Sequence, residues 1–372
     1  FWDALCQGRS GAKPVTCMDT SKLPRRSACT IDEPVDESIV GGRAAKLAVM
    51  AARQAMADAG LGRSLPAGAR CDISMGTTMG ETEFIEDKLH EDDAVWLGPE
   101  HVRRIVSGQP GVIARAVQSD CGAVGEADDL YGACAAGNMA ITLASRALAS
   151  KQCDIALAGG SDGFSQLAFI GFMRLRLMAA EQSRPFDKKR DGLLVGEGAT
   201  VFVLERASSA AARGARVRAR VAGSAMTSES YHPTRPDPEG DGLTRAIQGA
   251  LASADMAAAD IDYVNAHGTG TPQNDMIEAK VMDKCLRPGT PFSSTKALTG
   301  HTMGAAGAME AAACVLSMER QMLVPTWHLQ DVLEPCLMDA VRDGPRPAVV
   351  RAVLNNSAGF GGYNSSVVLT AS

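Results

Sequence analysis

Residues 129–149, DLYGACAAGNMAITLASRALA, decide how the rest of the chain is interpreted. They place Cys134 in a Gly/Ala-rich turn, directly before a segment of small and aliphatic residues with helical spacing. A thiol at a helix N-terminus meets unpaired backbone N–H groups and the positive end of the helix dipole, which favour the nucleophilic thiolate. The alternative is a small buried apolar side chain, which is what most free cysteines are. This stretch alone leaves both interpretations open.

Composition places the chain among ordinary globular proteins. Its 372 residues are 45% hydrophobic and 22% charged, enough for one large or two ordinary domains. The net charge of −6 and the lack of a basic run with interleaved aromatic residues argue against a nucleic-acid partner. No apolar segment of the sequence has transmembrane length, so no membrane partner is expected. The 10 cysteines form no CxxC pair and no zinc-like cluster, which favours a reducing cytoplasm and no metal site.

Strand and helix signals alternate along the chain, which suggests an α/β layer arrangement. The abrupt start at Phe1 suggests that a leading strand is missing. Two histidines, His90 among acidic residues and His232 in a loop, are interpreted as solvated or structural. The predicted helices are residues 44–60, 98–117 (broken at 109–111), 134–150 and 243–254, and residues 294–318 are predicted as a loop that leads into a further helix. The predicted strands are residues 70–80, 153–159, 199–204, 217–225, 261–265, 348–354 and 366–369, with a loop before the last strand.

The second half of the chain repeats the plan of the first. Residues 206–214 form a polar, small-residue break, which is interpreted as the seam between the halves. Residues 134–150 and 294–318 are small and apolar nearly all round, so both helices should be buried on all sides. One such helix in each half suggests a duplicated fold with the two helices back to back at its centre.

Four motifs carry reactive or ligand-binding groups. The first is Cys134 at its helix start, and the second is NAHGTGT, residues 265–271, where His267 follows a strand. The third is Lys296 and His301 before the second buried helix, with Glu310 inside that helix. The fourth is GFGG, residues 359–362, a glycine loop whose N–H groups can approach a ligand closely. Taken singly, each motif could be a turn, a helix cap or a satisfied core group.

Together these motifs resemble those of a β-ketoacyl-[acyl carrier protein] synthase of the thiolase superfamily, over essentially the whole chain. The similar segments are FWDALCQGRSG (residues 1–11), RPFDKKRDGLLVGEGA (184–199), NAHGTGTPQND (265–275), STKALTGHTMGAAGAME (294–310) and GFGGYN (359–364). The resemblance implies a thiolase-like, duplicated five-layer α-β-α-β-α fold with two buried central helices. It implies an N-terminal half, residues 1–206, that carries the nucleophile and lacks the leading strand, and a C-terminal half, residues 207–372, that carries the two histidines.

The resemblance also implies a role for each matching residue. Cys134 would hold the acyl chain as a thioester, and His267 and His301 would handle the malonyl group. Lys296, Glu310 and Asp275 match charged residues that support the site. Phe360 matches a gate for malonyl access, and Thr269 and Thr271 match threonines that bind the pantetheine arm. Backbone N–H groups of Cys134 and Phe360 would form the oxyanion hole.

The chemistry expected of such a site is decarboxylative Claisen condensation. It needs an acyl group held covalently, for which a thiolate is suited, and N–H donors that stabilise the enolate formed when a malonyl thioester loses CO2. No cofactor is expected, because pantetheine arrives on an acyl carrier protein. The partners implied are that carrier, acyl and malonyl thioesters, and a second copy in a homodimer, paired through the strand near residues 153–159.

The chain departs from the family pattern at two places. Ala135 and Ala136 follow the nucleophile where Ser or Thr is frequent, and Ala358 replaces a phenylalanine two positions before Phe360. The lost ring suggests an acyl pocket that accepts a bulkier or unusual group. A non-elongating acyltransferase or decarboxylase remains an alternative, as does a non-catalytic partner subunit of a heterodimer, although such subunits generally lack the nucleophile. A thiolase is disfavoured, because the last loop has no second cysteine. Acyl length, pathway, and whether the enzyme is free-standing or part of a modular synthase stay open.

Overall fold

The N-terminal half is built on one mixed sheet. The structure, a computed structural model, describes residues 1–62, 65–66, 68–82, 86 and 111–372. The sheet has the order β4-β3-β5-β6, in which β4, β3 and β5 are parallel and β6 runs antiparallel to β5. Its strands are β3 (Cys71–Gly76), β4 (Ala127–Leu130), β5 (Ile155–Asp162) and β6 (Gly198–Glu205).

The C-terminal sheet follows the same plan in the order β11-β9-β8-β13-β14-β7. Strands β9, β8 and β13 are parallel, and β14 runs antiparallel to β13, as β6 does to β5. The strands are β7 (Ala219–Ser228), β8 (Tyr263–Asn265), β9 (Pro291–Ser293), β11 (Asp339–Ala340), β13 (Ala352–Gly359) and β14 (Tyr363–Ala371). The repeated order confirms the predicted duplication.

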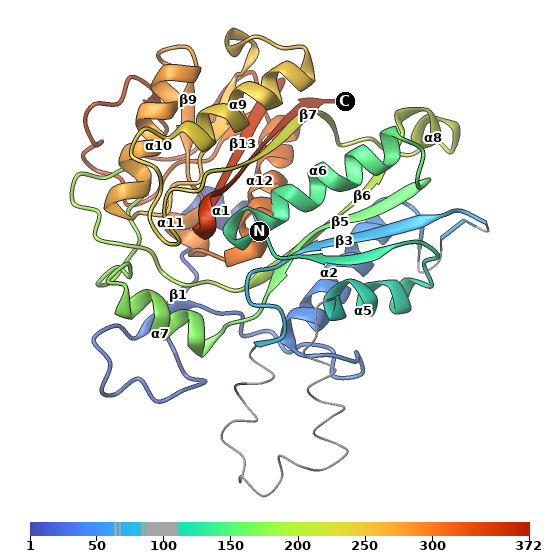
Figure 1. Cartoon of the computed structure of the whole chain (residues 1–372), viewed down its shortest axis with the longest axis horizontal. Helices are drawn as coiled ribbons and strands as arrows, with labels where there is room; N and C mark the ends of the chain where they lie inside the picture. Colours follow the sequence, from blue (N-terminus) through green and yellow to red (C-terminus); the bar gives the residue numbers. More distant parts are fainter. Residues whose placement is uncertain (63–64, 67, 83–85, 87–110) are drawn as a thin grey trace, which may run out of the picture.

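Helices complete five layers, as the thiolase-like fold requires (Figure 1). One pair, α2 (Arg43–Asp58) and α5 (Val112–Cys121), packs on the outer face of the N-terminal sheet, and a second pair, α9 (Asp241–Ala254) and α10 (Pro272–Cys285), lies over the C-terminal sheet. Between the sheets lie α6 (Ala136–Ala149) and α12 (Ala306–Arg320), which contact each other. None of the helices among the described residues is long and apolar enough to cross a membrane.

The remaining elements connect these layers. They are α1 (Trp2–Gln7), β1 (Ala12–Pro14), β2 (Ser27–Cys29), η2 (Ala133–Ala135), α7 (Gln166–Arg174), α8 (Ala207–Ala212), η3 (Ala258–Asp260), α11 (Lys296–Thr299), η4 (Met303–Ala305), β10 (Met322–Leu323), β12 (Arg346–Pro347) and η5 (Phe360–Gly362). The expected break at residues 206–214 therefore contains the short helix α8, and the division of the chain at residue 206 stays a prediction. His90 and residues 98–110 of the helix predicted at 98–117 lie outside the described part of the chain.

Glycines let the two central helices approach closely. A Cβ on Gly137 would lie 2.8 Å from the backbone nitrogen of Ala308, and one on Gly307 would lie 2.9 Å from that of Asn138. The prediction that both helices are buried on all sides is wrong for α6, because Leu143 on its outer side is 37% exposed. α6 and α12 come from different halves of the chain and contact each other. This contact brings Cys134, just before α6, and His301, just before α12, toward the centre of the molecule.

Two strand predictions are also wrong. The expected loop before residue 366 is mostly a hairpin, because β13 runs to Gly359 and β14 begins at Tyr363, with only η5 between them. Small polar residues such as Asn355 fit this strand because their side chains find buried hydrogen bonds. The strand expected to pair with its copy, β5, is hydrogen-bonded on both sides, to β3 and β6, so it cannot do so. The edge strand of this sheet next to the nucleophile is β4.

Candidate active site

Cys134 sits in a sharp turn between β4 and α6. The turn is the 3-10 segment η2, and its first residue, Ala133, has a φ of 47°, a left-handed conformation that is rare for a residue with a side chain. Gly359 comes close on the other side, since a Cβ on it would lie 3.0 Å from the Cys134 nitrogen. This close approach brings the loop that carries Phe360 to the nucleophile.

The resting Cys134 side chain is a thiol. Complete burial raises its pKa to about 12, although the charge of Lys296 and the backbone N–H groups of Phe360 and Cys134 act in the opposite direction. The expected thiolate is therefore wrong for the resting protein, because desolvation outweighs the N–H groups at the turn. Those two N–H groups point at the sulfur, where an oxyanion hole was expected.

His267 follows β8 in a loop that is tied down by a carboxylate. The backbone N–H groups of His267 and Gly268 donate to Glu278 at 2.7 and 2.8 Å. Glu278 is fully buried on α10, and burial raises its pKa to about 7 despite these two donors. Glu278 was not predicted from the sequence. Its position one helical turn after Asp275, on the same helix face, is the signal that could have found it.

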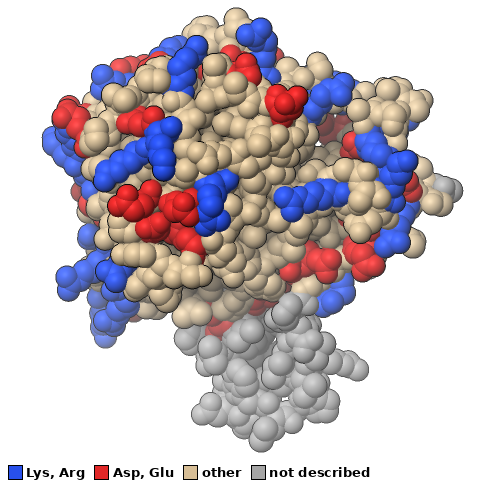
Figure 2. Space-filling view, turned by 45° about the horizontal axis from the view of Figure 1, so that its top comes forward, with Lys and Arg blue, Asp and Glu red and all other residues tan. Residues whose placement is uncertain are grey.

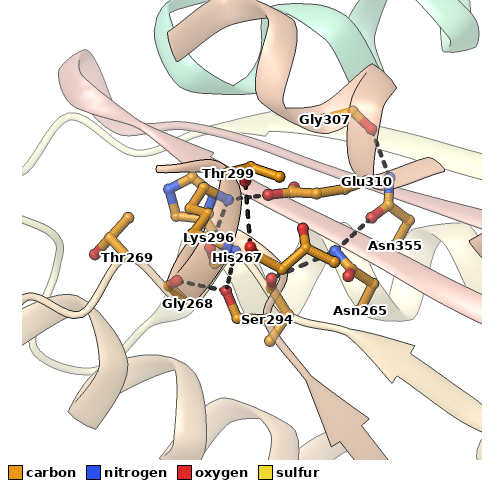
Figure 3. Close-up of polar contacts among 12 residues, drawn as sticks. Asn265, His267, Gly268, Thr269, Ser294, Lys296, Thr299, Gly307, Glu310 and Asn355 are labelled. Carbon is orange, nitrogen blue, oxygen red and sulfur yellow. Dashed lines mark hydrogen bonds and ion pairs between the residues drawn. The ribbon is translucent and has the colours of Figure 1, made fainter. Parts of the chain in front are cut away.

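A buried ion pair stands behind the His267 ring (Figure 3). Lys296 and Glu310 are in direct contact, and the Lys296 ammonium also donates to the His267 carbonyl at 2.6 Å and lies 3.4 Å from His267 Nδ1. An ammonium has no acceptor, so His267 Nδ1 accepts and the hydrogen of the neutral ring is on Nε2. Burial, the Lys296 charge and His301 hold the pKa of His267 well below its usual range, which keeps this ring neutral.

His301 lies next to His267 but comes from a different element. The two ring centroids are 5.3 Å apart and the rings are nearly perpendicular, at 81°. The His301 N–H donates to the Leu194 carbonyl, and its own carbonyl accepts from Gly196, which joins the loop before α12 to the N-terminal half. Burial and the Lys296 charge lower the pKa of His301 as well, so the site holds two neutral imidazoles.

One cavity brings the expected groups together. Its lining contains Cys134, His267, His301, both predicted threonines, Ala358 and Phe360. Thr269 and Thr271 bond each other through their hydroxyls at 2.9 Å. Lys296, Glu310 and Asp275 do not line this cavity. The complete lining is Cys134, Phe172, Leu177, Leu193, Glu229, His232, Thr234, Arg235, Pro236, His267, Thr269, Thr271, Gln273, Asn274, His301, Ala358, Gly359, Phe360, Gly361, Gly362 and Asn364.

Asp275 holds the backbone near the cavity without lining it, which agrees with its expected role as a residue that supports the site and not with substrate binding. Its carboxylate accepts from the N–H groups of Phe186, Thr269 and Gly270 at 2.8 to 3.2 Å. The side chain is fully buried, and burial raises its pKa. Asp275 therefore holds the loop that presents the two threonines.

Two parts of the cavity wall were missed by the sequence analysis. One is apolar: Phe172 on α7 packs against Phe360, with ring centroids 5.5 Å apart. The other is the loop from Glu229 to Pro236, in which His232 lines the cavity, and of the two interpretations of His232 the structural one is confirmed. His232 Nδ1 accepts from the N–H groups of Thr234 and Arg235, which holds the ring in place at the cavity. No pattern in the sequence indicates that this loop and the GFGG turn, residues 359–362, line the same cavity.

Acidic and basic side chains are mixed on the face of the molecule shown in Figure 2, without one large area of a single sign. Within the described residues, no group of three or more His, Cys, Asp or Glu side chains is placed to hold a metal ion. All 10 cysteines are free thiols.

Comparisons with known proteins point to one family. Residues 1–210 match the model of the β-ketoacyl synthase N-terminal domain, and residues 218–330 match the model of its C-terminal domain. A 3-oxoacyl-[acyl-carrier-protein] synthase 2 of Coxiella burnetii is 34% identical, over 100% of this chain and 94% of that protein. The ketoacyl synthase alpha subunit of the tetracenomycin polyketide synthase of Streptomyces glaucescens is 33% identical, over 99% and 92%.

Solved structures agree with these sequence matches. The ishigamide ketosynthase/chain length factor superimposes with a TM-score of 0.91 and 35% identity, over 100% of this chain and 94% of the other. A ketosynthase in complex with its type II PKS acyl-carrier protein superimposes with a TM-score of 0.90 and 26% identity, over 100% and 95%.

Proposed function

The chain belongs to the β-ketoacyl synthase family, and on that premise we propose that it joins an acyl group held on Cys134 to a malonyl group on acyl carrier protein, with loss of CO2. The observation that carries this proposal is the single cavity lined by Cys134, His267 and His301. The product is a β-ketoacyl thioester, as in fatty-acid and polyketide synthesis.

The first half-reaction loads the nucleophile. Cys134 Sγ attacks the acyl thioester carbon, the bond from that carbon to the pantetheine sulfur breaks, and the thiol proton ends on the departing sulfur. The oxyanion formed on the way is stabilised by the backbone N–H groups of Cys134 and Phe360. Loading replaces a thiol of high pKa by a neutral thioester, which removes the desolvation problem of a buried thiolate.

The second half-reaction makes the carbon–carbon bond. The malonyl carboxylate leaves as CO2, and its bonding electrons form an enolate whose oxygen accepts hydrogen bonds from His267 and His301. The enolate carbon attacks the Cys134 thioester, the C–C bond forms, and the Sγ–C bond breaks to return the sulfur, which takes a proton from water. Neutral imidazoles suit this step, because each can donate an N–H to the oxygen, and one such donor is typically worth about 10²–10³ in rate.

Supporting residues position these groups. Lys296 and Glu310 hold the His267 tautomer. We propose that Thr269 and Thr271, whose hydroxyls line the cavity wall, bind the pantetheine arm, and that Phe360 gates malonyl access. The reaction is redox-neutral and its acyl carrier arm arrives with the carrier protein, so we propose no resident cofactor.

We propose that the enzyme is a cytoplasmic homodimer. Ten free thiols suit a reducing compartment. Among the described residues, the edge strand β4 pairs with β3 alone, and Tyr131, directly after β4, and Leu143 on α6 are exposed, as expected for a surface that a second copy covers. Leu143→Arg should convert the dimer to a monomer in sedimentation experiments, and an unchanged dimer would put the interface elsewhere.

The test follows the acyl group by intact-protein mass spectrometry. The protein is incubated with acyl carrier proteins bearing different acyl chains, and malonyl carrier is then added. The proposal expects one acyl mass on the peptide with Cys134, then its loss with formation of a β-ketoacyl carrier. Cys134→Ala should abolish both steps, and Cys17→Ala, an exposed thiol away from the cavity, should abolish neither. Acyl transfer or CO2 release without a new C–C bond would favour the rival acyltransferase or decarboxylase.

A further inference from the structure

Three fully buried amide side chains form a network between the central helices. Asn355 donates from Nδ2 to Asn138 Oδ1 at 2.8 Å and to the Gly307 carbonyl at 2.9 Å. Its Oδ1 accepts from Asn265 Nδ2 at 3.1 Å. Asn138 Nδ2 in turn donates to the Asn355 carbonyl at 3.1 Å. All three side chains are 0% exposed, and Figure 3 shows Asn355 between Gly307 and Asn265.

Each member of the network belongs to an element that carries one group of the active site. Asn138 lies on α6, one helical turn after Cys134, and Gly307 is the second residue of α12, the long helix that follows His301. Asn265 ends β8 just before His267, and Asn355 lies on β13, the strand that leads to Phe360. Asn355 therefore bonds directly to the nucleophile helix, the His301 helix and the His267 strand.

The hydrogen bonds of this network restrict the arrangement of the three elements more strictly than the apolar packing around them does. Buried amides are expensive unless their N–H and C=O groups are paired, and a half-satisfied network is less favourable than an apolar core. Asn355 uses both N–H groups and its side-chain oxygen, so its geometry is met in one arrangement of the three elements. Small apolar residues such as Ala308 and Ala311, which are buried on α12, would by themselves allow several nearby arrangements.

We propose that Asn355 is a positioning residue that sets the distance between the Cys134 turn and the two histidines. This inference rests on the function proposed above, because it concerns the step that needs both sets of groups at once. Acyl loading uses the Cys134 turn and the Phe360 loop. Condensation also requires the enolate, held by His267 and His301, to reach the thioester carbon, and a misplacement of about 1 Å can lower such a rate about 10²-fold.

The variant that tests this is Asn355→Leu, which keeps a similar volume and removes the three side-chain hydrogen bonds. Asn138→Ala breaks the same link from the other side, with a residue that favours helix, and serves if the leucine variant does not fold. The matched control is Ser366→Ala, which removes the buried hydrogen bond to Asn356 Oδ1, at 2.8 Å, in the same strand pair but outside the network.

Three quantities are measured on each protein: the rate of acyl loading, the rate of β-ketoacyl formation, and the CO2 released per β-ketoacyl product. For Asn355→Leu we expect loading within about threefold of the wild type and product formation lowered about 10²-fold. We also expect more than one CO2 per product, because misplaced enolate is quenched by water. Ser366→Ala should keep the wild-type ratio.

A purely structural role would give a different result. Loss of folded enzyme lowers loading and product formation by the same factor and leaves CO2 and product in the wild-type ratio, and that outcome would overturn the inference. Unchanged rates in both network variants would overturn it as well. If the wild type itself forms no β-ketoacyl product, the proposed function fails, which is distinguishable from failure of the positioning role.

Discussion

The turns before the two central helices have nearly the same sequence and shape but different contents. ACAAG, residues 133–137, and MGAAG, residues 303–307, each begin with a non-glycine residue of positive φ, 47° at Ala133 and 55° at Met303, and each leads into a buried helix. In the second turn the N–H of Gly304 donates to Asp162 at 2.6 Å. In the first, the equivalent N–H, that of Cys134, faces the cavity.

We call the turn at Gly304, which binds a carboxylate, the filled cradle, and the turn at Cys134, which binds none within the described residues, the open cradle. The filled cradle holds the Asp162 carboxylate, which also accepts from Thr77 and from the N–H groups of Thr78 and Met79. The open cradle consists of the N–H groups of Cys134 and Phe360 and has no carboxylate, because β13 ends in Gly359 where β5 ends in Asp162. A duplicated scaffold thus uses one anion-binding turn to join its halves and leaves the other for a reacting oxygen.

The largest expected effect comes from removing the two imidazole donors that line the same cavity as the open cradle. His267→Ala and His301→Ala should each lower β-ketoacyl formation about 10²–10³-fold, because one enolate donor is lost. Loading of Cys134, measured by mass spectrometry, should continue in both variants. The control is His328→Asn, since His328 bonds the Ser183 carbonyl and does not line the cavity. An equal loss of loading and condensation in the histidine variants would contradict the assignment.

The next effect concerns the stability of the filled cradle. A Cβ on Gly304 would lie 2.4 Å from the backbone of Thr77, so Gly304→Ala should lower the free energy of unfolding by about 3 kcal/mol. Chemical denaturation measures this difference. Gly171→Ala is the matched control, because nothing lies within 4 Å of the added methyl. Equal stability of the two variants would show that this turn tolerates a side chain as the Cys134 turn does.

A smaller, pH-dependent effect is expected for Asp162→Asn. Burial raises the pKa of Asp162 to about 6 in the folded protein, above its usual 3.8. The folded state therefore binds this proton more tightly than the unfolded state, and the stability it contributes is fully present below about pH 4 and is lost as pH rises through 6. The asparagine removes hydrogen bonds to the carboxylate but has no such titration.

The variant should accordingly be less stable than the wild type by about 1–3 kcal/mol, with a deficit that shrinks as pH rises from 4 to 7. Denaturation curves of both proteins at each pH measure the difference, in which the titration of other carboxyl groups cancels. A deficit that grows with pH would mean that the folded protein stabilises the charged form of Asp162.

The smallest effect is expected at the rim of the open cradle. Ala358 lines the cavity beside Gly359, so Ala358→Phe should fill space there without touching the donors. The rate of Cys134 loading should fall by about tenfold for bulky acyl groups and stay near the wild type for short linear ones. A panel of acyl carriers measures the preference. A wild-type preference for short linear chains, unchanged in the variant, would contradict the idea of an enlarged pocket.

The reactive side chains could be predicted from the sequence better than the buried residues that hold them in place. Cys134, His267 and His301 were predicted because each lies where a predicted helix begins or a predicted strand ends, and the two small-residue helices predicted the duplicated fold. Asp162 was missed because a buried carboxylate that accepts backbone N–H groups leaves no periodic pattern. Glu278 was missed although its spacing from Asp275 places both on one helix face. Asn355 was assigned to a loop, because a polar residue in a strand is explained only by partners distant in sequence.

The wrong predictions about the charge of Cys134, the burial of Leu143 and the position of β5 all concern properties that depend on tertiary structure. The thiolate expected for Cys134 took account of the helix terminus but not of complete burial, which the sequence does not specify residue by residue. Leu143 was expected to be buried because composition alone cannot show that one side of α6 faces outward. β5 was expected at an edge, although strand order depends on long-range pairing.

The account is tested most directly by a crystal structure of the protein with an acyl group on Cys134. It predicts the thioester oxygen at about 2.7–3.1 Å from the backbone nitrogens of both Cys134 and Phe360. It also predicts that Asp162 still accepts from Gly304 and that the His267 and His301 rings face the thioester carbon. A thioester oxygen turned away from both nitrogens, or two rings out of reach of that carbon, would contradict it.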